Sequence, residues 1–274
     1  MKKFWVGIPV LFILALLSVV LKIQISHHGK LMNLSSDLSF SDKFRRMDLS
    51  DQALTSLQKL EESGYPKGRL LAALLPWNNF QTPPKVPWNL ETFQTAYDEF
   101  ASYRGREFEQ FLKSSEAVWN DIQVFPVQDK VTYENSWMSK RNFGGNRGHE
   151  GCDLMPAKNL RNFYPVRSIT HGVVEKIGWL PQGGYRMGIR SPKGGYFYYA
   201  HFSSYFQDFQ VGQEISAGDI LGYMGDTGYG PEGTQGQFDV HLHVGIYFTC
   251  KDQEEISVNP YWILRYLEEW DDFR

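Results

Sequence analysis

Val-His-Leu-His-Val-Gly-Ile-Tyr-Phe, residues 240–248, is a short apolar run that predicts a β-strand in the second half of the chain. Residues two apart lie on the same face of a strand, so His241 and His243 project the same way and Leu242 points into the opposite layer. A histidine pair of this kind fits a surface feature of a sheet as well as a metal or catalytic site. The neighbouring stretches have to decide between the two.

Short apolar runs separated by Gly and Pro cover the chain from Val124 onward. The clearest predicted strands besides 240–248 are 173–177, 185–189, 196–200 and 220–224. Five of the 25 glycines precede residue 144, which marks a change from helices to strands and tight turns. Asn259-Pro260 begins a last helix, with Asn259 as its cap. Residues 124–274 are expected to form an antiparallel, mainly β domain closed at one end by this helix.

Residues 48–123 predict a small α-helical region instead. Leu54, Leu57 and Leu60 are spaced by three, and a second short helix is expected over Arg69–Leu75. A longer helix begins near Asn89, and its apolar face consists of Leu90, Phe93, Tyr97, Phe100, Phe108 and Phe111. Packing for stability explains this pattern, and no catalytic constellation precedes residue 124.

Residues 1–22 predict a transmembrane signal-anchor. The uncharged run Phe4–Leu21 has eighteen residues, in the lower range for a membrane-spanning helix, and no small-x-small cleavage site follows it. Lys2 and Lys3 favour a cytoplasmic N-terminus, which places the remainder of this single-pass protein outside the membrane. Residues 23–47 are polar and mixed and are expected to be a tether, in which the pair His27-His28 receives no role.

The charge balance and the cysteines exclude two further classes. The chain has 28 Lys and Arg against 31 Asp and Glu, so no basic face for nucleic acid is expected. Two cysteines are too few for a disulfide framework, and Cys152 and Cys250 are predicted to lie too far apart for a bridge. Two free thiols are therefore expected.

His149 and Asp153 are four residues apart in Arg-Gly-His-Glu-Gly-Cys-Asp, residues 147–153. Glycines at 144, 145, 148 and 151 disfavour a helix, since each one in a helix interior costs about 1 kcal/mol. The segment is expected to be extended and to lead into a strand near Cys152. Although it superficially matches His-Glu-x-x-His, that motif needs a helix, so Glu150 is rejected as a general base.

The side chains of His149, Asp153, His241 and His243 could meet at one zinc ion. Imidazole nitrogen and carboxylate oxygen suit zinc, and a set of His, Asp and His leaves a fourth position open for water or substrate. If His149, Asp153 and His243 bind the metal, His241 stays unligated on the same face. His201, which follows an aromatic strand, is its expected companion, whereas His171 is assigned to the surface.

The order His-x-x-x-Asp, a later single His after aromatic residues, and His-x-His before an apolar strand resembles the M23 family, the LytM and lysostaphin-type peptidoglycan endopeptidases. The stretches 211–219 and 222–228 are similar to the family's hairpin, which lipoyl carrier and barrel-sandwich domains share. No lysine lies where a lipoyl group would attach. The resemblance covers residues 124–260, and only the longer segment 228–238 departs from it, which leaves substrate preference open.

The resemblance implies zinc bound by His149, Asp153 and His243, with His201 and His241 as catalytic residues. One imidazole would accept the proton of the attacking water and the other would stabilise the oxyanion. The expected protein is a membrane-anchored bacterial zinc metalloendopeptidase that hydrolyses peptidoglycan stem peptides or cross-bridges. The alternative is a non-catalytic LytM-type scaffold or hydrolase activator. A third interpretation is autoinhibition by the stretch 136–147, which contains Asn142 and Asn146; the oligomeric state stays open.

Overall fold

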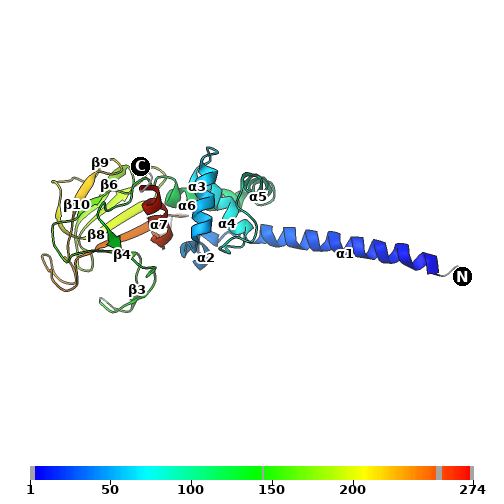
Figure 1. Cartoon of the computed structure of the whole chain (residues 1–274). Coiled ribbons are helices and arrows are strands. Elements are labelled where there is room, and N and C mark those ends of the chain that lie inside the picture. Colours follow the sequence, from blue (N-terminus) through cyan, green and yellow to red (C-terminus); the bar gives the residue numbers. More distant parts are fainter. Residues whose placement is uncertain (1–3, 144, 251–254, 272–274) are drawn as a thin grey trace.

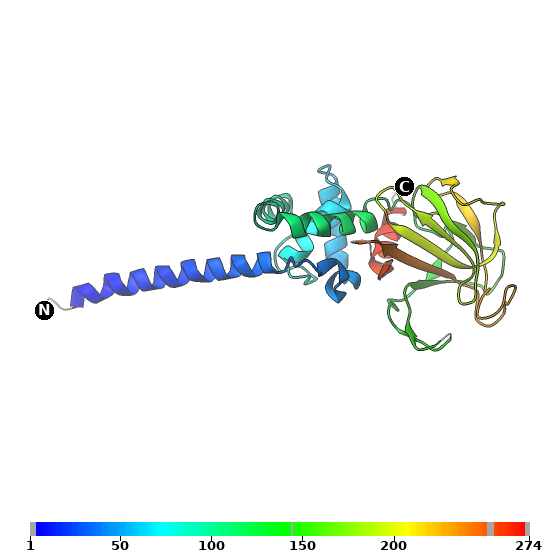
Figure 2. The same ribbon diagram turned by 180° about the vertical axis from the view of Figure 1, so that it is seen from behind.

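The computed structural model describes residues 4–143, 145–250 and 255–271 and shows an elongated molecule (Figure 1). Helix α1 (Phe4–Met32) projects from one end, a cluster of helices lies in the middle, and a β domain forms the other end. Seen from behind, the same three parts follow one another along the long axis (Figure 2).

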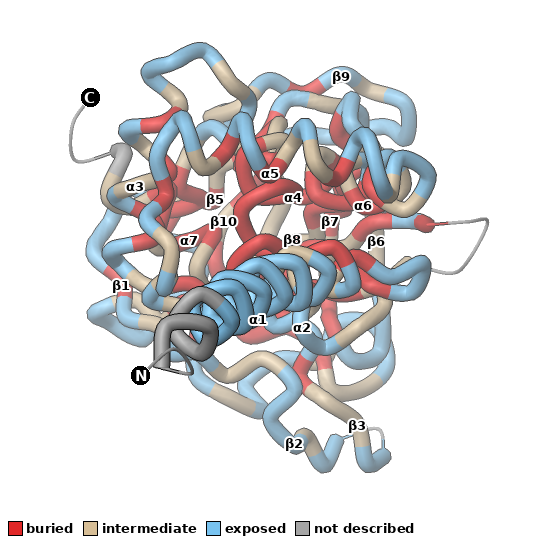
Figure 3. The backbone as a smooth tube through the Cα atoms, turned by 90° about the vertical axis from the view of Figure 1, so that its right-hand side faces the viewer, coloured by how far each residue is buried: buried red, intermediate tan, exposed pale blue. Residues whose placement is uncertain are grey.

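Within α1, the segment Val10–Met32 is long and apolar enough to cross a membrane by length and composition. Viewed along the molecule, α1 stands out as an exposed rod in front of the buried interior (Figure 3). The helix does not end near Lys22 as expected but continues to Met32. No proline interrupts residues 22–32, so nothing in the local sequence stops it.

The expected tether at 23–47 is therefore a wrong prediction, because most of this segment is helical and residues 33–47 contribute buried side chains. After α1 come a 3₁₀ turn, η1 (Leu38–Phe40), and α2 (Asp42–Arg45). Leu34, Leu38 and Phe44 are buried. These apolar residues are too few and too irregularly spaced to form a periodic pattern, so only tertiary packing reveals them.

The helical region contains four more helices: α3 (Asp51–Glu61), α4 (Lys67–Trp77), α5 (Leu90–Tyr103) and α6 (Gly105–Trp119). Asn89 caps α5, since its Oδ1 accepts a hydrogen bond from Thr92 N at 2.8 Å. The single long helix expected from Asn89 is in fact two helices. The chain breaks at Arg104, whose φ of −138° and ψ of 33° are not helical, next to the flexible Gly105.

The β domain is antiparallel, as predicted. Its main sheet follows the order β1-β4-β11-β8-β7-β6-β9, while β10 pairs with β5 and β8, and β12 pairs with β11. The strands of this sheet are β1 (Val131–Thr132), β4 (Cys152–Pro156), β5 (Pro165–Arg167), β6 (Gly172–Leu180), β7 (Gly184–Arg190), β8 (Tyr196–Tyr205), β9 (Glu214–Ile215), β10 (Ile220–Met224), β11 (Leu242–Phe248) and β12 (Ile256–Val258). A separate two-stranded ribbon joins β2 (Lys140–Arg141) to β3 (Arg147–Gly148).

Helix α7 (Tyr261–Asp271) lies between the sheet and the helical region (Figure 1). Asn259 Oδ1 accepts a hydrogen bond from Tyr261 N at 3.0 Å, so the predicted cap is present. Cys152 and Cys250 are both free and buried, which confirms the prediction of two thiols.

The hydrophobic core runs without interruption from the helical region into the β domain. The ring of Phe44 packs against Phe111 at 4.9 Å and against Phe248 of β11 at 5.7 Å between centroids. Arg45 Nε donates to Ser257 O at 3.0 Å, and Asn259 N donates to Arg45 O at 2.8 Å. The helices therefore complete the core beneath the sheet.

Candidate metal centre and catalytic groove

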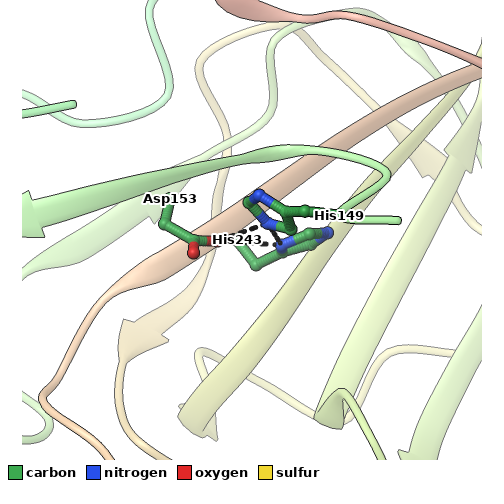
Figure 4. A group of neighbouring side chains, drawn as sticks. All are labelled: His149, Asp153 and His243. Atoms are coloured by element: carbon green, nitrogen blue, oxygen red, sulfur yellow. Dashed lines mark hydrogen bonds and ion pairs between the residues drawn. The ribbon is translucent and has the colours of Figure 1, made fainter. Parts of the chain in front are cut away.

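Asp153 and His243 meet because β4 and β11 place them directly opposite each other. Residues paired in this way project from the same face of the sheet. His149, on the extended approach to β4, adds its Nε2 at 3.0 Å from both Asp153 Oδ1 and His243 Nδ1, and His243 Nδ1 lies 2.9 Å from Asp153 Oδ1. These three side chains converge on one point, as Figure 4 shows, and could hold a metal ion.

Gly151 permits this close approach of the two segments. A Cβ at this position would lie 2.4 Å from His243 Cε1 and 2.5 Å from Val244 O, both far inside van der Waals contact. The backbone of His149 is held by hydrogen bonds to the ribbon: its N donates to Ser139 O at 2.9 Å, and its O accepts from Met138 N at 2.7 Å. The close approach of this segment to β11 therefore requires an extended backbone with glycine at 151. The glycine content of the segment predicted such a backbone.

The electrostatics of the cluster fit a cation. His149 Nε2 and His243 Nδ1 both face one carboxylate oxygen, Asp153 Oδ1, at 3.0 Å and 2.9 Å. Burial would raise the pKa of Asp153, but the hydrogen bonds to His149 and His243 outweigh it and hold the pKa well below its usual range. A positive ion between these atoms satisfies all three.

Arg141 is a member of the site that the sequence analysis did not identify. Its Nη2 donates to Asp153 Oδ2 at 2.5 Å and lies 2.9 Å from His149 Nδ1. Asn142 and Asn146, which were considered as residues that cover the metal, are exposed. Arg141 reaches the cluster because it lies on the β2–β3 ribbon, which packs beside His149 and Asp153. The spacing of residues in the sequence does not predict this contact.

His201 and His241 lie beside the cluster, with ring centroids 4.7 Å apart. His201 Nδ1 lies 2.7 Å from Thr227 O, and His241 Nδ1 lies 2.8 Å from Asp239 O. A carbonyl can only accept, so each Nδ1 carries the proton and each Nε2 keeps a lone pair. His241 Nε2 is 3.8 Å from Asp153 Oδ1. The predicted five residues are therefore neighbours in space.

The backbone of His201 is unusual, because its φ of +67° lies in the left-handed region that non-glycine residues rarely adopt. Its N donates to Gly183 O at 2.8 Å, outside the regular ladder between β7 and β8. Burial, followed by the nearby His241 and His243, lowers the pKa of His201 well below its usual value. The imidazole is therefore kept neutral.

Comparison with known proteins agrees with this geometry. Residues 147–260 match the model of peptidase family M23. The crystal structure of lytM from Ruminococcus gnavus, to which glycyl-glycine endopeptidase activity is ascribed, is 41% identical, covers 88% of this chain and 96% of that chain, and superposes with a TM-score of 0.75. The chain belongs to peptidase family M23.

Two further relatives match about half of the chain. The L-Ala–D-Glu endopeptidase of Bacillus subtilis is 40% identical over 148 residues, which are 53% of this chain and 43% of that protein. The chain thus spans less than half the length of this curated relative. The catalytic domain of lysostaphin from Staphylococcus simulans is 24% identical over 49% of this chain and 92% of its own, with a TM-score of 0.39.

The M23 domain carries a groove of about 620 Å³ over the cluster. Segment 228–238, where the sequence departs from the family pattern, forms part of its edge through Tyr229 and Phe238. Phe238 contacts the ring of His201 at 4.7 Å between centroids. Tyr229 stacks on Phe143, which the β2–β3 ribbon carries, at 4.1 Å and an angle of 4°. An aromatic contact therefore joins segment 228–238, at the edge of the groove, to the β2–β3 ribbon.

The remaining histidines lie outside this M23 site. His171 Nδ1 is 2.8 Å from Gln123 Nε2 in an exposed position, as expected of a surface residue. His27, which received no role, pairs with Glu99 at 2.7 Å and fastens α1 to α5. Glu150 is exposed at the rim of the groove.

Proposed function

We propose that this M23 protein is a zinc-dependent endopeptidase that hydrolyses peptide bonds in the stem peptides or cross-bridges of peptidoglycan. The observation that carries this proposal is the pair His201 and His241, whose Nε2 lone pairs lie beside the metal-type cluster. The L-Ala–D-Glu endopeptidase relative supports it, because such a bond occurs in stem peptides. The lytM relative supports a peptidase of cross-bridges.

His149, Asp153 and His243 would hold the zinc ion. Two atoms bound to one tetrahedral zinc at about 2.0–2.1 Å lie about 3.3 Å apart, which is near the 2.9–3.0 Å between the three ligand atoms here. When bound, zinc polarises the scissile carbonyl and lowers the pKa of a coordinated water from 15.7 toward about 7. Arg141 fixes the carboxylate of Asp153 by binding its second oxygen.

The two free imidazoles supply proton transfer. One of them accepts the proton of the attacking water at Nε2 and, once protonated, donates it to the amine that leaves. The other lies close enough to donate to the oxyanion when it is protonated. The backbone carbonyls of Thr227 and Asp239 orient the two rings and stabilise the imidazolium that forms. Burial lowers the pKa of His201 and so favours its neutral form, which is the form that can accept a proton.

We also propose that α1 anchors the protein in the membrane, with the M23 domain on the extracytoplasmic side. Lys2 and Lys3, on which the orientation rests, lie outside the described residues. The proposed division is an anchor beginning at residue 1, a helical region up to 123 and a peptidase domain at 124–274. Residues 33–47, which were expected to be part of a tether, are assigned to the helical region because they pack there.

The test uses the full chain in detergent with zinc added. Zinc content is measured by mass spectrometry, and purified sacculi are digested and their muropeptides identified. His201→Ala and His241→Ala should each keep zinc and lose most activity, by about 100-fold or more. Asp153→Ala should lose zinc and activity together. His171→Ala, exposed and remote from the cluster, is the control.

The outcome separates the two candidate classes. Soluble muropeptides released only with zinc support the peptidase. Protein that binds zinc but releases no product from sacculi instead supports the non-catalytic scaffold or hydrolase activator. Activity near wild type in both histidine variants would contradict the proposed proton transfer.

A further inference from the structure

A row of paired residues crosses the floor of the groove. Asp153 on β4 is opposite His243 on β11, and His243 is opposite Ala200 on β8. Beyond Ala200, the bulge between Tyr185↔Phe202 and Met187↔Tyr199 brings Arg186 of β7 alongside it. Strands lie about 4.8 Å apart, so the Cα of Arg186 is about 10 Å from that of His243 across two strand spacings.

The small side chain of Ala200 leaves room for a substrate residue in the middle of this row. Directly paired residues share a face of the sheet, and Ala200 lines the groove together with His243 and Arg186. Its methyl group is the smallest side chain that a non-glycine residue can present. A substrate residue that lies over Ala200 therefore has the metal-type cluster on one side and a guanidinium on the other.

Arg186 differs from the other cations on its side of the groove. Arg190 donates to Glu175 and Glu255, and Lys176 lies 3.6 Å from Glu255. By contrast, Nε and Nη1 of Arg186 are buried and find no hydrogen-bond partner among the described residues. Leaving buried donors of a charged group unpaired is costly, and buried charges in proteins are normally paired.

Arg186 lies next to the site. It lines the same groove as Tyr198 of the neighbouring strand β8. The ring of Tyr198 contacts His243 edge-on, with centroids 5.9 Å apart. Arg186 and the cluster are therefore parts of one groove.

We propose that Arg186 is a specificity-determining residue that binds a free carboxylate on the substrate residue next to the bond that is cleaved. A guanidinium presents parallel N–H donors that match a carboxylate in bidentate geometry. Rotation of the Arg186 side chain within the groove that it lines would bring Nε and Nη1 to such a carboxylate, which would supply the partner that they lack. This inference rests on the proposed peptidase function and names the class of peptide that the groove selects.

A carboxylate-binding Arg186 would favour one of the two peptide bonds that the names of the relatives give. An L-Ala–D-Glu bond is flanked by a residue that carries a carboxylate, whereas a glycyl-glycine bond is flanked by none. An unpaired cation beside the cluster favours the acidic peptide. Arg186 therefore predicts a glutamyl-type residue beside the cleaved bond.

The experiment compares three synthetic peptides with the zinc-loaded full chain in detergent. The first contains L-Ala–D-Glu–L-Lys linked through the γ-carboxyl, with the α-carboxylate free. The second is identical except that this carboxylate is a carboxamide, and the third is pentaglycine. Cleavage is followed by mass spectrometry, and binding of each peptide is measured independently by calorimetry with His241→Ala protein.

We expect the wild-type kcat/KM for the carboxylate peptide to exceed that for the carboxamide by about 10- to 100-fold. This is the effect expected of charge-assisted hydrogen bonds between Arg186 and the carboxylate. Arg186→Gln should remove this preference, chiefly through KM, while zinc content stays at the wild-type level. Arg186→Lys should keep part of it, since the charge remains but the bidentate geometry is lost. Lys176→Gln, which removes a cation already paired with Glu255, should keep the preference.

Two failures are distinguishable. Absence of cleavage of all three peptides and of sacculi would contradict the proposed function, yet tighter binding of the carboxylate than of the carboxamide peptide would still support Arg186 as its ligand. Equal binding and equal cleavage of the two peptides by wild type would overturn the inference, as would an unchanged preference in folded, zinc-containing Arg186→Gln protein.

Discussion

Thr227 and Asp239 each present a backbone carbonyl to the Nδ1 of a histidine. At the scale of single residues, these two contacts decide the tautomers of His201 and His241 and therefore which nitrogen is available for proton transfer. Arg141 makes a comparable contact to the cluster, because it binds the oxygen of Asp153 that does not face the histidines. The chemistry of the site thus depends on neighbours of the ligands as much as on the ligands.

Arg141→Ala tests this dependence. The variant should bind zinc about 10- to 100-fold more weakly, since groups that orient metal ligands typically contribute this much. Competition with a chromogenic chelator measures the affinity, and Asn142→Ala, an exposed neighbour, is the control. Tighter zinc binding in Arg141→Ala would contradict the orienting role and show that the guanidinium competes with the metal.

Tyr199 gives a second test at this scale. It is fully buried, and its hydroxyl accepts a hydrogen bond from Ile169 N at 2.7 Å. Tyr199→Phe leaves that N–H unsatisfied, so the free energy of unfolding should fall by about 1–3 kcal/mol. Urea denaturation measures the change, with Tyr103→Phe, exposed on α5, as the matched control. A Tyr199→Phe midpoint equal to that of wild type would refute the assignment.

At the scale of elements, the cluster depends on how closely β4 and β11 approach each other. Gly151 lies where a Cβ would collide with His243 and with the backbone of Val244. Gly151→Ala should therefore displace His243 and reduce both zinc content and stability, the latter by about 1–3 kcal/mol. Gly105→Ala, where nothing lies within 4 Å of the added Cβ, should keep zinc content and stability. Full zinc occupancy in Gly151→Ala protein would show that the strands can separate without cost.

Strands β6 and β7 are joined by an ion cluster in which Arg190 donates to Glu175 at 2.5 Å and 2.8 Å. This hydrogen bonding lowers the pKa of Glu175 in the folded protein. A carboxyl whose folded pKa is depressed stabilises the fold above its unfolded pKa, about 4.3, and loses that contribution as the pH falls through the folded value. Unfolding of Glu175→Gln protein should therefore depend less steeply on pH below about 4.3 than unfolding of wild type. Identical pH profiles would argue against the coupling.

At the scale of the whole molecule, the helical region and the M23 domain share one hydrophobic core. Phe44 lies between Phe111 and Phe248, and Arg45 is hydrogen-bonded to Ser257 and Asn259. Helix α1 adds a rigid extension, because His27 pairs with Glu99 and Lys30 lies over the ring of Trp77 at 4.3 Å. The apolar helix α1 is therefore joined to the rest of the molecule through packed structure and not through a loose linker.

Truncation tests this shared core. A chain of residues 124–274 would expose Phe248 and its neighbours, so it should aggregate or lose a cooperative unfolding transition. Removal of residues 1–24 keeps the packed helices and should leave a soluble, cooperatively folded protein. Near-ultraviolet circular dichroism and thermal denaturation compare the two. A cooperative transition in 124–274 would show that the M23 domain folds independently.

The sequence by itself determined the local features of this protein: an apolar N-terminal helix, the antiparallel strands, and the histidine and aspartate spacings that place side chains on one face. It did so because a strand alternates its faces every residue and because Asn89 and Asn259 satisfy helix N-termini locally. Only the tertiary structure decided that residues 33–47 pack into the helical region, that Arg104 divides one expected helix into two, and that Arg141 and Arg186 belong to the groove. Those outcomes depend on contacts between segments far apart in the chain, whose energies no local pattern of residues contains.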